Sequence, residues 1–106
     1  MNIQFKKGVL DMCVLAMLRE KDGYGYDIAD SLSNRIKLAD GTVYPILRKL
    51  AADGLVSTYL MESQNGPPRK YYHLTEDGKN KLEEYINDWE EFNKVVKGII
   101  GGKDIE

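Results

Sequence analysis

Residues 55–75 read LVSTYLMESQNGPPRKYYHLT. β-Branched and aromatic residues dominate Leu55 to Leu60 and again Arg69 to Leu74, a composition typical of short strands. Between these segments, Gln64 to Pro68 contains Asn, Gly and two Pro, which favour turns. The stretch therefore predicts a β-hairpin.

Three helical segments precede the hairpin. Residues 5–20 are apolar on most sides, so this helix needs cover on more than one face. A turn at Asp22 to Gly25 separates it from a second helix, which directs Ile28 and Leu32 inward. Apolar residues at helical spacing predict a third helix over Gly41 to Asp53.

Pro45 leaves two possible starts for the third helix. If the helix begins near Thr42, the proline falls in the first turn, where its missing N–H costs little. If it begins at Asp40, the proline ring crowds the carbonyl group of Gly41 and bends the axis. The sequence does not choose between these starts.

A long acidic helix is predicted after the hairpin. Thr75 is a suitable N-cap, and Glu76 and Asp77 follow in the first turn, where the helix dipole favours negative charge. Apolar residues recur along this helix at heptad spacing, which is typical of a surface that packs on another helix. We expect them to form a homodimer interface, with folding back onto the same domain as the alternative; they are Leu82, Tyr85, Trp89, Phe92, Val96 and, at the end, Ile99.

Three helices followed by a hairpin describe a winged helix, the helix-turn-helix variant in which the hairpin is the wing. The predicted fold class is therefore mainly α with a small β-hairpin: a winged helix-turn-helix plus a long C-terminal dimerisation helix. We assign residues 1–75 to a DNA-binding winged helix and residues 76–100 to a dimerisation helix packed with residues 5–20. Residues 101–106 are expected to form a frayed tail.

The composition is typical of a globular protein and argues against a membrane span, a disulfide and a zinc site. With 106 residues, 42% apolar and 30% charged, the chain resembles one globular domain. The apolar run Val9 to Leu18 is too short for a membrane span, which needs about twenty residues. Cys13 is the single cysteine and His73 the single histidine, so neither an internal disulfide nor a structural zinc site is expected. We expect a cytoplasmic protein that needs no metal or cofactor and does not bind membranes.

Catalysis is not expected. The chain has one histidine and one cysteine, and it lacks the glycine-rich loops that cradle phosphates. Carboxylate pairs such as Asp27 with Asp30 fall on helical surfaces, where solvated charge is the usual state. Two other functions compete: binding DNA, and binding another protein through the winged helix.

Charge is distributed unevenly along the chain. The net charge is −2, but residues 35–75 carry +3 and residues 76–106 carry −4. The third helix and the hairpin are therefore the basic part of the chain, so a polyanion would approach from that side. A winged helix that bound only protein would not need this basic cluster. Taken alone, the charge distribution could also be ordinary surface variation; the feature that favours double-stranded DNA over a protein partner is the set Arg48, Lys49, Arg69 and Lys70 on the third helix and the wing.

Three motifs occur in order along the chain, namely Gly23-Tyr24-Gly25-Tyr26-Asp27-Ile28, Gly41-Thr42-Val43-Tyr44-Pro45-Ile46-Leu47 and Arg69-Lys70-Tyr71-Tyr72-His73-Leu74-Thr75. Together they resemble the PadR family of bacterial transcriptional regulators, and the short acidic helix is similar to its short-chain branch. The resemblance implies a repressor that binds a palindromic site as a homodimer. One departure is Ala39, where relatives often have a helix-capping Ser or Asn; Asp40 is the expected substitute.

In such regulators, the resemblance implies, the third helix enters the major groove and the wing contacts the backbone and minor groove. Hydroxyl and basic side chains on the outer side of this helix and on the wing suit bases and phosphates. For Thr42 the alternative role is helix capping, for Tyr44 it is packing over the second helix, and for Arg69 and Lys70 it is a solvated hairpin tip. We expect DNA contacts from Thr42, Tyr44, Arg48, Lys49, Arg69 and Lys70.

Trp89, the only tryptophan, matches in position the tryptophan of multidrug-binding short PadR proteins. There, the resemblance implies, the tryptophans of two subunits flank a pore that takes planar aromatic compounds. The alternative is simple packing in the interface, since a tryptophan in a heptad stripe is more often a packing residue. The candidate ligand-binding residues are Trp89, Asp88, Phe5, Val9, Met12 and Cys13.

Overall fold

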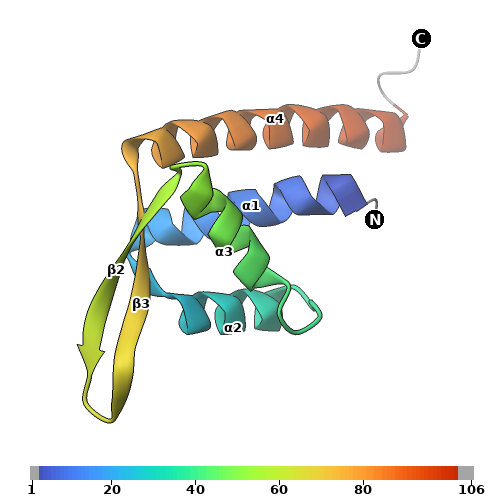
Figure 1. The fold of residues 1–106 in the computed structure, drawn as a ribbon. Helices are drawn as coiled ribbons and strands as arrows, with labels where there is room; N and C mark the ends of the chain where they lie inside the picture. The colour runs from blue at the N-terminus through green and yellow to red at the C-terminus, as the bar shows by residue number, and fades with distance from the viewer. Residues whose placement is uncertain (1–2, 103–106) are drawn as a thin grey trace.

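The structure, a computed structural model, describes residues 3–102, with side chains from residue 8 onward. Helices and a small sheet follow one another in the predicted order, so the mainly α winged-helix class is confirmed (Figure 1). The elements are α1 (Ile3–Glu20), β1 (Gly23–Tyr24), α2 (Gly25–Arg35), α3 (Val43–Ala52), β2 (Val56–Ser63), β3 (Gly66–Leu74) and α4 (Glu76–Gly101).

The wing, residues 56–74, is an antiparallel hairpin with a third short strand added. The strand order is β1-β3-β2, and β1 pairs through Gly23↔Tyr72 and Tyr24↔Tyr71. The segment of β1 was predicted to be a turn, because Gly23 and Tyr24 are too few residues to show a strand pattern and another glycine follows them. Pro67 and Pro68, predicted in the turn, lie in β3 instead. They are tolerated there because β1 does not reach them, which leaves one side of β3 without a neighbouring strand.

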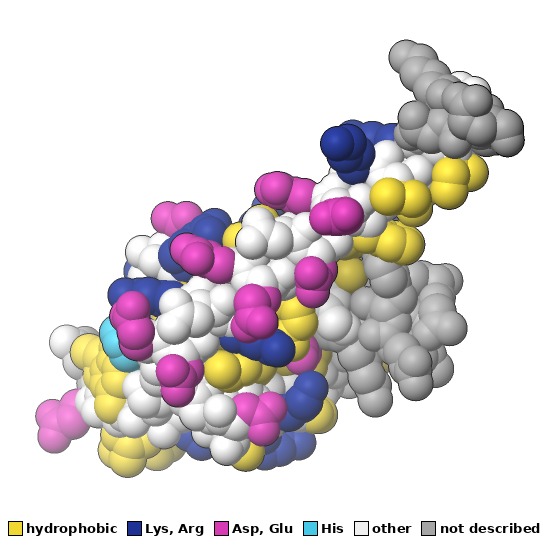
Figure 2. Space-filling model, turned by 90° about the horizontal axis from the view of Figure 1, so that it is seen from above, with side chains coloured by type: hydrophobic (Ala, Val, Ile, Leu, Met, Phe, Trp, Pro, Cys, Tyr) yellow, Lys and Arg dark blue, Asp and Glu magenta, His cyan; other side chains and the backbone are white. Residues whose placement is uncertain are grey.

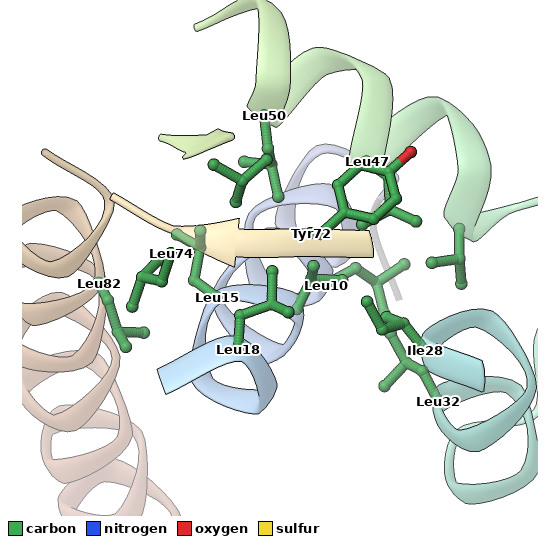
Figure 3. Close-up of a cluster of buried hydrophobic side chains, with 13 residues drawn as sticks. Leu10, Leu15, Leu18, Ile28, Leu32, Leu47, Leu50, Tyr72, Leu74 and Leu82 are labelled. Atoms are coloured by element: carbon green, nitrogen blue, oxygen red, sulfur yellow. The ribbon is translucent and has the colours of Figure 1, made fainter. Parts of the chain in front are cut away.

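The hydrophobic core lies where the helices meet the inner face of the wing. Residues from α1, α2, α3, β2, β3 and α4 contribute buried side chains to it (Figure 3). Tyr72 of β3 enters the core beside Gly25, where an added Cβ would come within 3.1 Å of the tyrosine ring. The absent side chain at Gly25 thus makes room for Tyr72, and the wing is anchored to the start of α2.

Helix α3 begins at Val43, so Pro45 falls in its first turn, as the first of the two predicted starts requires. Thr42 occupies the N-cap position, but its side chain makes no capping bond; its Oγ1 donates to the carbonyl oxygen of Ala39 at 2.7 Å. The expectation that Asp40 caps this helix is therefore wrong. Gly41 (φ 81°) turns the chain into α3 at a backbone angle that suits glycine.

Helix α4 starts as predicted and runs further than predicted. The Thr75 hydroxyl accepts from the backbone N–H of Gly78 at 3.0 Å and donates to the carbonyl oxygen of Gly54 at 2.7 Å. The helix ends at Gly101, which was expected in a frayed tail, and Gly102 follows as its C-cap with φ 71°. Residues 103–106 of that tail lie outside the described residues.

Helix α4 packs antiparallel along α1 (Figure 1), in a molecule whose longest dimension is 62 Å. Leu82, predicted at a subunit interface, is 1% exposed and belongs to the chain's own core (Figure 3). That part of the interface prediction is wrong, because the first half of α4 is covered by its own domain. Among residues 3–102, none of the helices has the length and apolarity needed to cross a membrane.

Candidate nucleic-acid interface

Helix α3 divides into a buried side and an exposed side. Val43, Leu47 and Leu50 are buried, while Tyr44 and Arg48 are exposed on one flank of the helix. Tyr44 and Arg48 are four residues apart and so lie next to each other along the helix surface. The hydroxyl group of one and the guanidinium group of the other form a polar ridge on α3.

The two basic residues of the wing lie on different faces of β3, since adjacent residues of a strand point in opposite directions. Arg69 Cζ lies 4.9 Å from the centre of the Tyr24 ring, on the face turned away from the core. Lys70 Nζ lies 5.6 Å from the centre of the Tyr72 ring, on the face that packs on the helices. Cations therefore flank the wing on both sides.

Lys49 differs from the other predicted DNA contacts in the direction of its side chain. Its Nζ lies 3.3 Å from Oδ2 of Asp11, a residue of α1 that is 3% exposed. The hydrogen bond and charge of Asp11 raise the pKa of Lys49. Lys49 thus points toward α1, away from the ridge formed by Tyr44 and Arg48, and its charge balances a buried carboxylate.

A shallow cleft of about 250 Å³ lies between α1 and α4. It brings together four of the six candidate ligand residues, which sequence spacing alone could not show to be neighbours. Cys13 lines a different hollow, beside Arg35, where burial raises the pKa of its thiol. The side chain of Phe5 lies outside the described residues. The cleft is lined by Gly8, Val9, Met12, Tyr85, Asp88, Trp89 and Phe92.

The second half of α4 exposes an apolar stripe, seen near the C-terminal end of the helix in Figure 2. The heptad pattern predicted Tyr85 and Val96 in this stripe, but both are half-buried, and Tyr85 packs against the core. Val95 was not predicted, yet it is 51% exposed. A straight helix drifts by about 20° per heptad, so its exposed face moves away from a strict heptad pattern. The exposed stripe consists of Trp89, Phe92, Val95 and Ile99.

The model of the PadR-like family of transcriptional regulators matches residues 14–84, which span α1 from its middle, α2, α3, the wing and the first part of α4. The chain belongs to the PadR-like family of transcriptional regulators. The three motifs at residues 23–28, 41–47 and 69–75 all lie inside the matched segment. In this PadR-like protein they correspond to β1 with the start of α2, the start of α3, and β3.

Solved and curated relatives agree with this assignment. A crystal structure of a Streptococcus mutans protein has a TM-score of 0.85 at 35% identity and covers 94% of this chain and 93% of its own. A PadR-like transcriptional regulator from Bacillus cereus has a TM-score of 0.80 at 32% identity and covers 92% and 96%. The negative transcriptional regulator PadR of Bacillus subtilis is 26% identical over 93 residues, which are 84% of this chain but 51% of that protein.

The described residues contain no group of three or more His, Cys, Asp and Glu side chains that could hold a metal ion. The features that the structure does bring together are the polar ridge of α3, the two cations of the wing and the cleft between α1 and α4. The ridge and the wing are the candidate site for nucleic acid, and the cleft is the candidate site for a small ligand.

Proposed function

We propose that this PadR-like protein binds double-stranded DNA through α3 and the wing. The proposal rests on two features together: the exposed ridge of Tyr44 and Arg48 on α3, and the two cations of the wing, Arg69 and Lys70. The α3 ridge would enter the major groove, where hydroxyl and guanidinium groups read base edges. Arg69 and Lys70 would contact phosphates. Thr42, at the start of α3, donates its hydroxyl hydrogen to Ala39 but still has lone pairs that could accept a hydrogen bond from the amino group of a base.

The DNA-binding form is proposed to be a homodimer. Two copies related by a two-fold axis would place their α3 helices in successive major grooves, about 34 Å apart, on a palindromic site. The exposed apolar stripe of α4 supports this arrangement, since apolar side chains gathered on one helix face favour association with a second surface. Repression is the proposed effect on transcription, in line with the Bacillus subtilis relative, which is a negative regulator.

DNA binding is tested by selecting duplexes from a random-sequence pool and measuring their affinity by fluorescence anisotropy at several salt concentrations. A triple variant, Arg48→Ala with Arg69→Ala and Lys70→Ala, is compared with a control that removes the same charge from α4, Lys79→Ala with Lys94→Ala and Lys97→Ala. Each lost phosphate contact flattens the salt slope by about 0.9. We expect a flatter slope and weaker binding for the first variant only. Equal behaviour of the two variants would favour a protein-binding winged helix.

The cleft between α1 and α4 is proposed to bind a planar aromatic cation. Trp89 offers a ring for stacking, Val9 and Met12 offer an apolar wall, and Asp88 offers a negative charge. Because α4 also carries the proposed dimer stripe, a ligand in the cleft would change the angle between subunits and so the spacing of the two α3 helices. This is the proposed route by which a ligand would release DNA.

Ligand binding is tested by titrating the Trp89 fluorescence with proflavine, a planar aromatic cation, in the absence of DNA. We expect quenching at micromolar concentrations, and weaker binding in Asp88→Asn. Asp30→Asn, which removes the same charge from the surface of α2, is the control. Absence of quenching in a protein that is dimeric by light scattering would make Trp89 a packing residue.

A further inference from the structure

Three tyrosine rings lie in a row on the outer face of the wing, the face turned away from the core. Tyr71 of β3 lies in the middle, with its ring centre 5.9 Å from that of Tyr24 on β1 and 5.7 Å from that of Tyr59 on β2. The interplanar angles of 28° and 23° correspond to stacked rings. The row therefore crosses all three strands of the sheet.

Asp22 joins this face of the sheet to the end of α1. Its Oδ2 accepts a hydrogen bond from the hydroxyl group of Tyr59 at 2.7 Å, and its Oδ1 lies 2.8 Å from Nδ1 of His73. Each oxygen of one carboxylate thus contacts a different strand, β2 through Tyr59 and β3 through His73. These bonds lower the pKa of Asp22, so its charged form predominates at neutral pH.

Arg69 lies at the other end of the same face. Its guanidinium group lies over the Tyr24 ring, with 4.9 Å between Cζ and the ring centre. Tyr24 stacks on Tyr71, and Tyr71 stacks on Tyr59, whose hydroxyl group bonds to Asp22. A continuous set of contacts therefore leads from the Asp22 carboxylate to the Arg69 guanidinium.

Asp22 places a negative charge on the same face of the wing as Arg69, a proposed phosphate contact. A negative charge beside a surface that binds DNA weakens the attraction for phosphates, because binding depends on the local field of the protein. Removing such a charge should therefore strengthen DNA binding if charge is all that matters. If Asp22 instead holds the wing in place, removing it should weaken binding, so the two roles predict effects of opposite sign.

We propose that Asp22 is a positioning residue for DNA binding: it ties β2 and β3 to the end of α1 and so holds Arg69 where it contacts the DNA backbone. This inference rests on the proposed function, because it assigns a role within the same DNA-binding site. Asp22 itself does not contact DNA; it acts through Tyr59, His73 and the stacked tyrosine rings.

The first test compares Asp22→Asn with Asp30→Asn on a duplex selected by the wild-type protein. The two variants remove the same charge, but the exposed Asp30 lies on the surface of α2. We expect Asp22→Asn to bind about threefold more weakly or worse, and Asp30→Asn to bind as tightly as wild type or slightly more tightly. Equal or tighter binding by Asp22→Asn overturns the inference.

A double-mutant cycle tests whether Asp22 acts through Arg69. We expect Asp22→Asn with Arg69→Ala to bind no more weakly than Arg69→Ala alone, which corresponds to a coupling of about threefold or more. Asp22→Asn with Arg48→Ala, whose guanidinium is on α3, should show additive losses. If the losses are additive in both pairs, Asp22 is not coupled to Arg69 in particular, and the inference is overturned. That outcome would indicate a general loss of structure in Asp22→Asn.

Tyr59→Phe replaces Asp22→Asn in both tests if circular dichroism shows that the latter does not fold. It removes the hydroxyl group that bonds to Asp22 and keeps the stacked ring, and the same weakening of DNA binding is expected. A wild-type chain that selects no duplex overturns the proposed function and this inference with it. A wild type that binds DNA while Tyr59→Phe binds equally well overturns the inference alone.

Discussion

Asp11 shows how one side chain can link two helices of the winged domain. It lies on α1, is 3% exposed, and pairs with Lys49 of α3 across 38 positions of sequence. A buried carboxylate without a partner is costly, and Lys49 offsets part of that cost for Asp11. The pair therefore helps to hold α3 on α1, although from the sequence alone Lys49 was predicted to contact DNA.

Replacing Lys49 tests this link. Lys49→Met leaves the Asp11 carboxylate buried without its cation, and we expect it to lower the free energy of unfolding by about 1 to 2 kcal/mol. This loss is smaller than expected for a fully buried ion pair, because the Lys49 side chain is 63% exposed and solvent screens the pair. Lys49→Arg should retain most of the stability. Urea unfolding followed by circular dichroism measures both variants.

The matched control for this prediction is Arg48→Met. It makes the same kind of change at the neighbouring position, and lysine, arginine and methionine have similar helix propensities. We expect its stability to lie within about 0.5 kcal/mol of wild type, as is usual for exposed positions. If Arg48→Met and Lys49→Met lost equal stability, the pairing with Asp11 would contribute nothing.

The junction of the wing with α4 is the place where two elements set each other's position. Thr75 bonds to Gly78 inside α4 and to Gly54 after α3, and its backbone N–H donates to the carbonyl oxygen of Leu55 at 3.2 Å. Gly78 faces that same carbonyl group, and a Cβ built on it would overlap the oxygen. The first turn of α4 therefore lies against backbone, which cannot move aside as a flexible side chain can.

Gly78→Ala tests the contact at this junction. Alanine has the higher intrinsic helix propensity, but its methyl group would collide with the Leu55 carbonyl oxygen and press on Leu74. Forcing extra atoms into a packed site costs about 1 to 3 kcal/mol, and we expect a loss of stability in this range in thermal and urea unfolding.

Gly101→Ala is the control at the other end of α4. Among residues 3–102, no atom outside its own stretch of helix lies within 4 Å of a Cβ placed there, so we expect unchanged or slightly higher stability. A Gly78→Ala variant as stable as Gly101→Ala would mean that α4 can shift away from Leu55 at no cost.

The whole molecule has an elongated form, because α4 continues past the winged domain and exposes its apolar stripe. Phe92, Val95 and Ile99 are each about half exposed or more. The core, by contrast, is formed by the winged helix and by Leu82 in the first half of α4. A second copy that covered this stripe would remove apolar surface from water in both subunits. The proposed dimer would thereby also set the distance between the two α3 helices.

Val95→Glu tests the dimer. The variant would bury a charge in each subunit of the interface, and we expect the dissociation constant of the dimer to rise about tenfold or more in sedimentation equilibrium. Glutamate has a higher helix propensity than valine, so a weaker dimer would not reflect a weaker helix. Val95 does not line the cleft around Trp89, which keeps this test separate from ligand binding.

Asn87→Glu provides the control because it adds the same charge to an exposed position of α4 outside the apolar stripe. We expect its dissociation constant to stay within about twofold of wild type, since an exposed charge is not desolvated by association. If both variants weakened the dimer equally, the stripe would not be the interface.

Local patterns in the sequence were enough for the order and type of the helices and for the hairpin. Each of these depends on residues close together in the chain, such as the apolar spacing in α3 or the cap at Thr75. The strand β1 was not predictable, because its two residues form a strand only by pairing with Tyr71 and Tyr72, nearly fifty positions away. Similarly, helical spacing predicted that Leu82 lies on an apolar face of the helix, but it did not show that the core of the same chain covers this residue.

The sequence by itself determined the winged-helix class, the PadR motifs and the set of basic residues available for DNA. Only the tertiary structure decided what each of those side chains faces. In the structure, Lys49 pairs with Asp11, Arg69 lies over the Tyr24 ring, and Asp22 contacts both β2 and β3. The physical reason is that hydrogen bonds, ion pairs and ring contacts depend on distances between side chains, and partners far apart in the chain leave no periodic signal in the sequence.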